Sequence, residues 1–594
     1  MLCITTASFS VQVNGELAGF FQSSRGLRQG CSLSPYLFVM SMDVLSKMLD
    51  QAADLRKYGY HPRCKSIGLT HLSFADDLMV LSDGKVRSID GIVEVFDAFA
   101  KRSGLKISME KSTIYLAGLS DSTYQEIQER YQFDVGHLPV RYLGLPLVTK
   151  RLTSSDYMPL IERIKQKIGT WTSRFLSYAG RLNLIQSVIW SICNFWLAAF
   201  RLPRECIGEI DKICSAFLWS GPELNSHKAK IAWTTVCKPK QEGGLGLRSL
   251  KEANEVCCLK LIWRLVSHAN SLWVRWINKY LLKKDTFWSI KETTSLGSWM
   301  WKKLIKYRGV AKKFCKVEVN DGKSTSFWYD QWSTMGCLRD VVGVRGTIDL
   351  GIRQHMTVAE AWSGRRQKQH RTDILNRIEA ELLLKRQNQV DKEDRVLWKG
   401  KHDTYKAKFT TKDTWNHIRL TTTKVAWHNS VWFAHATPKY SFCAWLAMQN
   451  KLSTGDRMAH WNRGTQTSCV FCSHNIETRN HLFFSCPFSA EIWYALAKNI
   501  YKAKFSTNWS DLITSINGQW SDRLESFIAR YVFHATLHTI WRERNRRRHG
   551  ENPNPPARLI NWIDKQVRNQ LSTIRTSGDR RYDKGLQAWF QART

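Results

Sequence analysis

Three cysteines and a histidine near the end of the chain restrict its local fold more than any other feature of the sequence. Cys469 and Cys472 are separated by two residues, and His481 and Cys486 follow in the spacing C-x2-C-x8-H-x4-C. Structural zinc sites take four sulfur or nitrogen ligands in a closed tetrahedron, and a CxxC turn supplies two thiolates. We therefore expect these four residues to bind Zn2+ in a structural role, with His474 as a rival ligand. A buried CxxC with an unrelated histidine is the alternative.

A second compact signal is a pair of adjacent carboxylates. Residues 74–77 (Phe-Ala-Asp-Asp) are flanked by apolar residues, which predicts a hairpin over residues 71–80 with Asp76 and Asp77 at its tip. Carboxylates in an apolar setting are costly unless they are paired or bind a metal. Nucleotidyl transfer uses such carboxylates to hold two Mg2+ ions at the attacking and leaving oxygens. An ordinary acidic turn is the alternative, because aspartate is common in turns.

Further motifs lie in order around this hairpin. Residues 25–35 (Arg-Gly-Leu-Arg-Gln-Gly-Cys-Ser-Leu-Ser-Pro) offer two glycines for close backbone approach, two arginines for phosphates, and a helix start at Ser-Pro. Residues 103–112, which include Lys111, and residues 142–146 follow downstream. Ordered motifs at these spacings are very unlikely to arise by chance.

Together these motifs resemble the reverse transcriptases of plant LINE-type (non-LTR) retrotransposons. The resemblance implies that Asp76 and Asp77 are catalytic and bind Mg2+ during RNA-directed DNA synthesis. The implied nucleotide- and template-binding residues are Arg25, Arg28, Gln29, Gly30 and Lys111. The implied primer grip comprises Tyr142, Leu143 and Gly144. The implied partners are RNA, DNA and deoxynucleoside triphosphates.

The resemblance covers nearly the whole chain. Residues 327–332 (Phe-Trp-Tyr-Asp-Gln-Trp) match a tryptophan-rich signature found after the polymerase, and residues 431–454 resemble the start of the family's zinc-binding region. The implied fold is α+β and multidomain. Its expected parts are an incomplete reverse-transcriptase palm (1–150), a helical thumb (151–220), a helical connector with the tryptophan-rich motif (221–394), a small zinc-binding domain (395–500) and a basic helical tail (501–594).

One part of the family pattern is missing. The family carries a first catalytic aspartate on a strand well upstream of the arginine-glycine motif, whereas Glu16 is the only acid before Arg25 and the first aspartate is Asp43. Each factor of ten in rate corresponds to about 1.4 kcal/mol of barrier, and losing a metal ligand commonly costs several such factors. We therefore expect a truncated protein that does not polymerise DNA alone. The alternatives are a zinc-stabilised nucleic-acid-binding remnant, or a relic whose palm exposes a sheet edge.

The charge of the chain favours a nucleic-acid partner. Lys and Arg number 88 against 51 Asp and Glu, a formal net charge of +37. Lysine and arginine neutralise phosphates, although a basic solvated surface is the alternative. Residues 541–549 (Trp-Arg-Glu-Arg-Asn-Arg-Arg-Arg-His) could bind nucleic acid, direct nuclear import, or form one solvated helix face. Many tryptophans adjoin basic residues, which suits base stacking, but we expect most to lie in the core.

The sequence also carries signals about its compartment. Residues 1–20 lack the pattern of a signal peptide, and the apolar run over residues 188–200 is too short to span a bilayer. The 15 cysteines show no disulfide framework. We expect a protein of the nucleus or cytoplasm, neither secreted nor membrane-bound, whose oligomeric state stays open.

Hydrophobic periodicity predicts the order of elements in the palm. A palm-like sheet with helices on it is the architecture that this order favours. The expected strands span residues 8–13, 17–22, 114–118 and 142–148 and the hairpin at 71–80, and the expected palm helices begin at Ser34 and span 86–103. Helical patterns over residues 157–202, expected as the thumb, and over 249–268 in the connector follow the palm.

Overall fold

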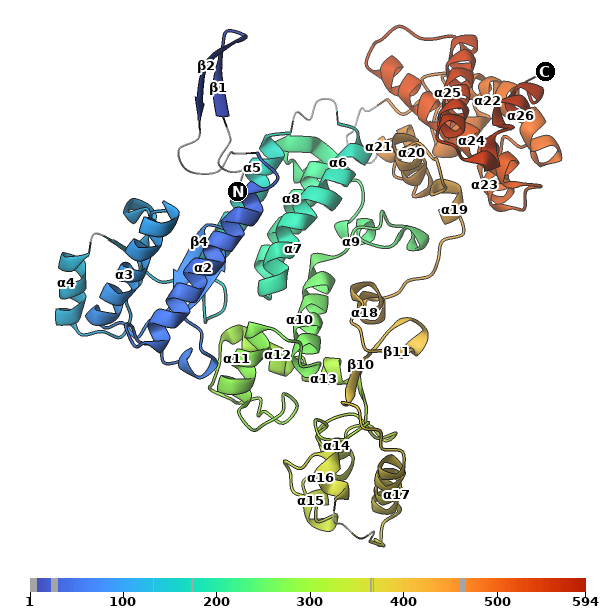
Figure 1. Ribbon diagram of the computed structural model, residues 1–594. Coiled ribbons are helices and arrows are strands. Elements are labelled where there is room, and N and C mark those ends of the chain that lie inside the picture. Colours follow the sequence, from blue (N-terminus) through green and yellow to red (C-terminus); the bar gives the residue numbers. More distant parts are fainter. Residues whose placement is uncertain are drawn as a thin grey trace. The chain divides into compact units, whose positions relative to one another are not determined.

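The chain forms two compact units, each built from two separate stretches of sequence. The computed structural model describes residues 8–22, 30–131, 133–171, 176–363, 366, 368–459 and 466–593 (Figure 1). Unit 1 combines Met1–Leu152 with Cys258–Thr414, and unit 2 combines Thr153–Cys257 with Trp415–Thr594. The structure is mixed helix and sheet and 55% helical, which confirms an α+β fold. The boundaries of the five expected parts stay predictions.

Unit 1 begins with a two-stranded hairpin. Strand β1 (Ser8–Val13) pairs antiparallel with β2 (Glu16–Gln22). The chain turns at Asn14 and Gly15, whose φ angles are +50° and +93°. Asparagine and glycine tolerate these left-handed conformations, so the hairpin predicted from Asn-Gly is confirmed.

A pair of helices forms the core of the first half of unit 1. Helix α2 (Ser34–Asp54) packs against α3 (Val86–Ser103). Pro35 lies in the first turn of α2, where its missing N–H leaves no partner unsatisfied. Both helices were predicted from their apolar periodicity. The buried residues of this core are Leu45, Leu49, Ala52, Ala53, Tyr58, Val95 and Phe99.

The predicted aspartate hairpin rests on this helical core. Strand β3 (His71–Phe74) pairs antiparallel with β4 (Asp77–Val80). Leu78 and Val80 of β4 pack against the core, which holds the hairpin at its base.

The continuous palm-like sheet expected from the sequence is not formed among the described residues. The short strands that follow occur as separate pairs, β5 (Thr113–Ile114) with β6 (Asp134–Val135) and β7 (Arg141–Tyr142) with β8 (Leu145–Pro146). The single strand expected over residues 142–148 is wrong. Leu143 and Gly144 have φ angles of +52° and +78°, so the chain folds back on itself between β7 and β8.

The second half of unit 1 contains a three-stranded sheet and a buried tryptophan-rich loop. The sheet order is β11-β10-β9, with β9 (Cys315–Glu318), β10 (Arg395–Lys399) and β11 (Tyr405–Lys406). Phe327, Trp328 and Trp332 of the signature are at most 2% exposed. The Trp332 indole N–H donates to the Phe327 carbonyl oxygen. These aromatic side chains therefore form core, as expected for most tryptophans, and no stacking surface.

The other helices of unit 1 surround these elements. They are α4 (Asp121–Arg130), α11 (Leu272–Ile277), α12 (Trp299–Lys306), α13 (Arg308–Lys312), α14 (Leu338–Val342), α15 (Gly346–Asp349), α16 (Val358–Trp362) and α17 (Asp373–Gln387). One boundary between the units falls between Leu152 and Thr153, and the other two fall within α10 (Leu250–Val266) and α18 (Thr411–Ile418).

Unit 2 is helical in its described residues. Its first stretch holds α5 (Ser154–Gly169), α6 (Tyr178–Leu184), the π-helical turn η4 (Ile185–Ile189), α7 (Trp190–Ala199), α8 (Arg204–Ser220) and α9 (Trp233–Val236). Its second stretch holds α19 (His428–Val431), α20 (Pro438–Met448), α21 (Gly455–Met458), α22 (Pro487–Tyr501), α23 (Trp509–Asn517), α24 (Arg523–Arg548), α25 (Pro556–Thr576) and α26 (Gly585–Gln591).

Helix α24 lies at the centre of the second stretch of unit 2. It packs against α20, α22 and α25, and most of its residues between Phe527 and Ile540 are buried. The helices expected for the C-terminal part are present. Helices α24 and α25 pack against the zinc-region helix α22, and the assignment of residues 501–594 as a separate basic tail stays a prediction.

The apolar run at residues 188–200 lies within a longer helix of unit 2. The run from Tyr178 to Ala199 is a single helix of 22 residues, because α6, η4 and α7 are continuous. By length and composition this helix could cross a membrane, although the apolar run alone is too short to do so. A single helix of this kind is a weak indication, since core helices of water-soluble proteins pass the same test.

The packing of α3 can be tested with two glycines. A Cβ on Gly91 would lie 2.6 Å from the Lys57 carbonyl oxygen, whereas Gly208 in α8 has no atom within 4 Å of that position. We expect Gly91→Ala to lower the free energy of unfolding by about 1–3 kcal/mol, through overpacking. Gly208→Ala should raise it by about 0.4–1 kcal/mol, because alanine restricts the unfolded chain. Thermal unfolding followed by circular dichroism measures both, and a stable Gly91→Ala protein would contradict the close contact.

Candidate catalytic hairpin and metal centre

The two aspartates lie at the tip of the β3–β4 hairpin, as predicted. Ala75 turns the chain with φ +52°, and Asp77 starts β4 opposite Phe74. The apolar setting expected for the acids is wrong, however. Phe74 is 62% exposed, and Ala75, Asp76 and Asp77 are exposed as well. The two carboxylates are therefore hydrated, and no cost of burial has to be offset by a bound metal. The role of the two acids as metal ligands stays a prediction.

A polar contact ties the base of this hairpin to α2. His71 in β3 lies with Nε2 2.5 Å from the Ser46 Oγ and with Nδ1 2.7 Å from the Thr70 Oγ1. The Thr70 hydroxyl donates in turn to an Asp50 carboxylate oxygen, at 2.5 Å. Burial lowers the pKa of His71, so it is mainly neutral at pH 7 and can donate from one ring nitrogen while accepting at the other. The hairpin is thus held by its base while its tip remains in solvent.

The structure brings one other predicted residue near the aspartates. Burial and the charge of Asp77 raise the pKa of Tyr142, so the phenol lies within the electrostatic reach of this carboxylate. Leu143 and Gly144 form the turn that follows Tyr142. This placement agrees with a site built from the aspartate hairpin and the predicted primer grip.

Of the remaining predicted residues of this site, the structure describes Gly30 and Lys111. Gly30 is exposed before α2, and Lys111 is exposed at the end of a short 3-10 turn (Met109–Lys111). Arg25, Arg28 and Gln29 lie outside the described residues. Their roles therefore stay predictions.

The four predicted zinc ligands do converge. One ligand atom from each of Cys469, Cys472, His481 and Cys486 lies within 4.8 Å of the others. The Cys469 and Cys486 sulfurs are 3.9 Å apart, and the Cys472 sulfur is 3.2 Å from His481 Nε2. Three sulfurs and one imidazole nitrogen at these distances suit a tetrahedral zinc ion. In the described part of the chain, this is the one group of three or more such side chains close enough to share an ion.

One cysteine of this cluster is held as a thiolate. The hydrogen bond with the Cys486 sulfur, together with the backbone N–H groups of Phe471 and Cys472, lowers the pKa of Cys469 well below its usual range, although burial opposes the shift. Thiolate is the form that binds metal. The same hydrogen bond and burial raise the pKa of Cys486, so that the proton stays on Cys486. Binding of a metal ion would displace this proton.

The rival ligand His474 lies beside the cluster without entering it. Its ring stacks on that of His481 at 4.6 Å between centroids, and its Nδ1 is 3.3 Å from the Ile476 carbonyl oxygen. The geometry thus favours His481 as the ligand and gives His474 a packing role.

Apolar residues next to His481 fix the cluster in unit 2. Residues His481–Ser485 form a π-helical turn, and Cys486 caps α22. Leu482, Phe483 and Phe484 are fully buried, and the Phe484 ring contacts those of Trp493 and Phe533. Apolar packing of these three residues therefore holds the turn that carries His481 and Cys486 in place.

A buried ion pair fastens the metal loop to α24. The Arg544 guanidinium donates to the Glu477 carboxylate at 2.6 Å, with side chains 4% and 0% exposed. Glu477 also accepts the backbone N–H of Gly455 at 3.1 Å. This pair was not among the residues predicted from the sequence. The signal for it was Glu477 itself, the single acid between residues 466 and 486 of a basic chain.

The neighbouring arginines of the basic run also contact the protein. Arg547 donates to Glu543 and its guanidinium lies 4.4 Å from the centre of the Phe488 ring. Arg548 donates to the Gln466 and Ser468 carbonyl oxygens. These arginines hold α24 against the metal loop, a role that none of the three sequence-based alternatives included.

Two family models match the chain at the positions of these two sites. Residues 2–147 match the reverse transcriptase (RNA-dependent DNA polymerase) family, and residues 409–493 match the zinc-binding region of reverse transcriptases. These matches support a reverse-transcriptase protein of a retroelement. They agree with the two parts of the resemblance drawn from the motifs, the polymerase and the zinc-binding region, and the Cys/His cluster lies within the second match.

Relatives of this chain include proteins of a plant and a frog. A provisionally named ribonuclease H protein of Arabidopsis thaliana is 26% identical over 366 residues, 59% of this chain and 57% of the relative. An uncharacterized 149 kDa protein of transposon TX1 in Xenopus laevis is 23% identical over 267 residues, 44% of this chain and 19% of the relative. An uncharacterized mitochondrial protein of Arabidopsis thaliana is 25% identical over 137 residues, 23% of this chain and 88% of the relative. The chain thus spans little more than half of the first relative and a fifth of the second.

The two histidines near the cluster give a test of zinc ligation. We expect His481→Ala to lose bound Zn2+ on dialysis against a mild chelator, because three thiolates alone leave the tetrahedron open. His474→Ala should keep one zinc per chain, since its ring lies outside the ligand group. Metal analysis of the dialysed proteins measures both. Zinc loss from His474→Ala with retention by His481→Ala would reverse the assignment.

The buried pair gives a test of the link to α24. Arg544→Met removes the closer of two cations beside the buried Glu477 carboxylate and leaves Arg548 at 3.6 Å. This loss should cost about 3 kcal/mol of stability. The matched variant Arg546→Met removes a more exposed pair with Glu551, with side chains 33% and 56% exposed. That loss should cost about 0–1 kcal/mol. Urea unfolding followed by tryptophan fluorescence measures the stability of both variants. Equal small losses of stability in the two variants would show that the pair of Arg544 and Glu477 contributes little.

Proposed function

We propose that this chain serves RNA-directed DNA synthesis and that Asp76 and Asp77 bind Mg2+ at the reacting phosphates. The observation that carries the proposal is the hairpin itself, which presents two adjacent carboxylates to solvent from an anchored base. Mg2+ keeps several waters and is usually held by one or two carboxylates plus substrate phosphates. Exposed carboxylates leave room for those waters and phosphates.

In the proposed reaction the primer 3′-hydroxyl attacks the α-phosphate of a deoxynucleoside triphosphate, and pyrophosphate leaves. Metal held by Asp76 and Asp77 would activate the hydroxyl and neutralise the charge that develops on the phosphate. Tyr142 lies near Asp77, where it would support the primer end. Arg28, Gln29 and Lys111 are proposed to contact template and nucleotide.

A second candidate function is nucleic-acid binding without catalysis. Within the described residues, Asp76 and Asp77 are not joined by a third metal-ligating side chain, whereas the Cys/His cluster is complete. Two-metal chemistry with an incomplete ligand set loses most of its rate. RNA and DNA would then bind through basic residues on a scaffold that zinc stabilises.

The role of the aspartates can be measured apart from turnover. We expect Asp76→Asn/Asp77→Asn to weaken binding of Mn2+, used as a magnetic probe for Mg2+, by about tenfold or more in the presence of primer–template. The matched variant Asp97→Asn changes an exposed acid of α3 outside the hairpin and should leave Mn2+ binding unchanged. Electron paramagnetic resonance titration of free Mn2+ compares the three proteins. Equal Mn2+ binding in all three would remove the aspartates from the metal site.

Primer extension on an RNA template then separates the two candidate functions. Because the ligand set is incomplete in the described residues, we expect the isolated chain to bind primer–template without extending it measurably. Primer extension by the unmodified chain that is absent from the Asp76→Asn/Asp77→Asn variant would instead establish polymerase activity. Salt-sensitive binding by both proteins with extension by neither favours the second candidate, and absence of binding would contradict both.

A further inference from the structure

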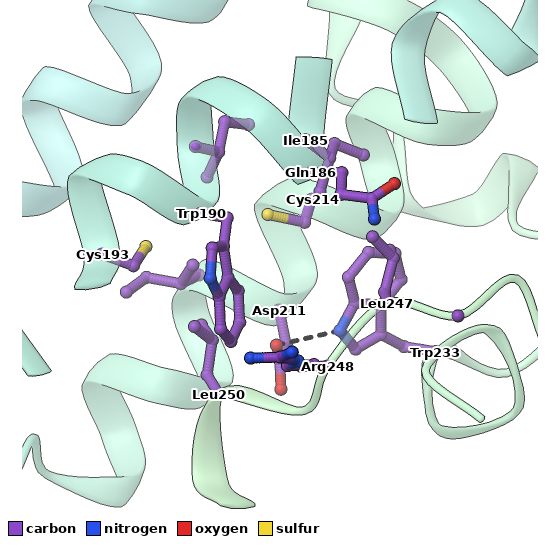
Figure 2. Close-up of a pocket in the computed structure, with 13 residues that line it drawn as sticks. Ile185, Gln186, Trp190, Cys193, Asp211, Cys214, Trp233, Leu247, Arg248 and Leu250 are labelled. Carbon is purple, nitrogen blue, oxygen red and sulfur yellow. Dashed lines mark hydrogen bonds between the residues drawn. The ribbon is translucent and has the colours of Figure 1, made fainter. Parts of the chain in front are cut away.

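Unit 2 contains a cavity that the proposed function does not use. It has a volume of about 270 Å³ and lies between the π-helical turn η4, helix α8 and the segment after α9 (Figure 2). The side chains that line it include two indoles, one carboxylate, one guanidinium and one carboxamide, from Trp190, Trp233, Asp211, Arg248 and Gln186. Ligand pockets with a few convergent polar groups in an apolar wall are the usual form of a small-molecule site, and those for drug-sized ligands start at about 300 Å³. This cavity therefore suits a ligand of one ring system.

The carboxylate in this cavity has acceptor capacity to spare. Asp211 Oδ1 accepts the Trp233 indole N–H at 2.9 Å. An ionised carboxylate can accept about four hydrogen bonds. Burial raises the pKa of Asp211 to about 6, so the group is mostly ionised at pH 7 although it is largely shielded from water. A half-buried carboxylate with unused acceptor sites favours a ligand that donates hydrogen bonds.

The walls of the cavity suit a flat aromatic ligand. In Figure 2 the Asp211 carboxylate lies between the side chains of Trp190 and Trp233, so a ring that reached the carboxylate would meet indole surfaces. Trp190 directly follows η4, a π-helical turn, and such turns are frequent at functional sites because they displace side chains from the regular helical row. Stacking of a base on an aromatic side chain contributes about 1–3 kcal/mol.

We propose that this cavity binds a guanine base, with the Asp211 carboxylate accepting two hydrogen bonds from its Watson–Crick edge. Guanine is the one common nucleobase that carries adjacent N–H donors there, at N1 and at the exocyclic amine. Adenine and cytosine place a ring-nitrogen acceptor beside their amine, which would face a carboxylate oxygen, and uracil flanks its single N–H with carbonyl oxygens. Unstacked bases of single strands are commonly recognised in this way, by stacking and by hydrogen bonds to their edges.

Arg248 is the residue of this cavity that could bind the phosphate of a nucleotide. Its side chain is exposed at the cavity, with the guanidinium 5.9 Å from the centre of the Trp415 ring. An exposed guanidinium can reach a ribose phosphate outside while the base is inside. The same chemistry fits a free guanine nucleotide and a guanine extruded from a strand.

The site can be tested with the zinc-loaded full chain and the four ribonucleoside monophosphates as probes. We expect guanosine monophosphate to bind at least tenfold more tightly than the other three, measured by equilibrium dialysis. Asp211→Asn should remove this preference, because its amide N–H₂ faces the donors of guanine. Its amide oxygen can still accept the Trp233 N–H, which keeps the fold. The control Glu209→Gln changes an exposed acid on α8 that pairs with Lys165 and should leave binding unchanged.

Two further arms complete the experiment. Asp76→Asn/Asp77→Asn should bind guanosine monophosphate normally, so failure of the polymerase proposal leaves this one standing. Competition by an octamer of uridine with one central guanosine, compared with octauridine, shows whether a guanine within a strand also enters. Equal affinity for all four nucleotides, or a guanine preference that survives in a folded, zinc-containing Asp211→Asn protein, would overturn the proposal.

Discussion

The buried ion pair between Arg544 and Glu477 holds the metal loop to the helices of unit 2. The loop that carries Cys469 and Cys472 has few apolar side chains of its own, so outside contacts must fix its shape. Glu477 binds the N–H of Gly455, and Arg544 reaches the Ser453 carbonyl oxygen, so three segments distant in sequence meet at one pair of charges. Because charges this deeply buried are costly when unpaired, each partner restricts the position of the other. The convergence of the four zinc ligands depends on that restriction.

The aspartate hairpin differs from the metal loop because its acidic end is exposed to solvent. Its base is fixed by apolar packing of Leu78 and Val80 and by the contacts of His71, whereas its tip lies in solvent. A structural metal site benefits from complete enclosure, but a site for phosphate transfer has to admit a primer, a nucleotide and water. The two sites of this chain therefore differ in exposure for chemical reasons. Burial of the ligands is expected at the zinc site but is not required at the aspartate hairpin.

Sequence reasoning located the elements whose signals are local. Asn14-Gly15 sets a hairpin turn by backbone preference, Pro35 marks a helix start, and the spacing of Cys469 to Cys486 matches a metal site. It failed where the outcome depends on distant contacts. The turn at Leu143 carries no strong local signal. The exposure of Asp76 and the burial of Arg544 were set by packing that the sequence does not display.

The cavity at Asp211 shows the same limit. Its lining comes from η4, α8 and the segment after α9, which no motif connects. One signal was present, because Asp211 is an acid adjacent to a stripe of buried residues on α8 that includes Ile207, Ile210 and Cys214. A single acid beside an apolar helix face marks either a paired group or a site, and only the arrangement of Trp190 and Trp233 around it distinguishes them.

The contacts of the arginines in α24 change what the charge of this protein means. A net charge of +37 suggests a large release of counterions when the protein meets a polyanion. Arg544 and Arg547 already lie against carboxylates, and Arg548 against carbonyl oxygens. A guanidinium that already pairs with a carboxylate or carbonyl oxygen of the protein holds few counterions. It therefore releases few counterions when it binds a phosphate. The ionic-strength dependence of RNA binding should therefore reflect the lysines and arginines that remain unengaged on the surface, and a count of basic residues overstates it.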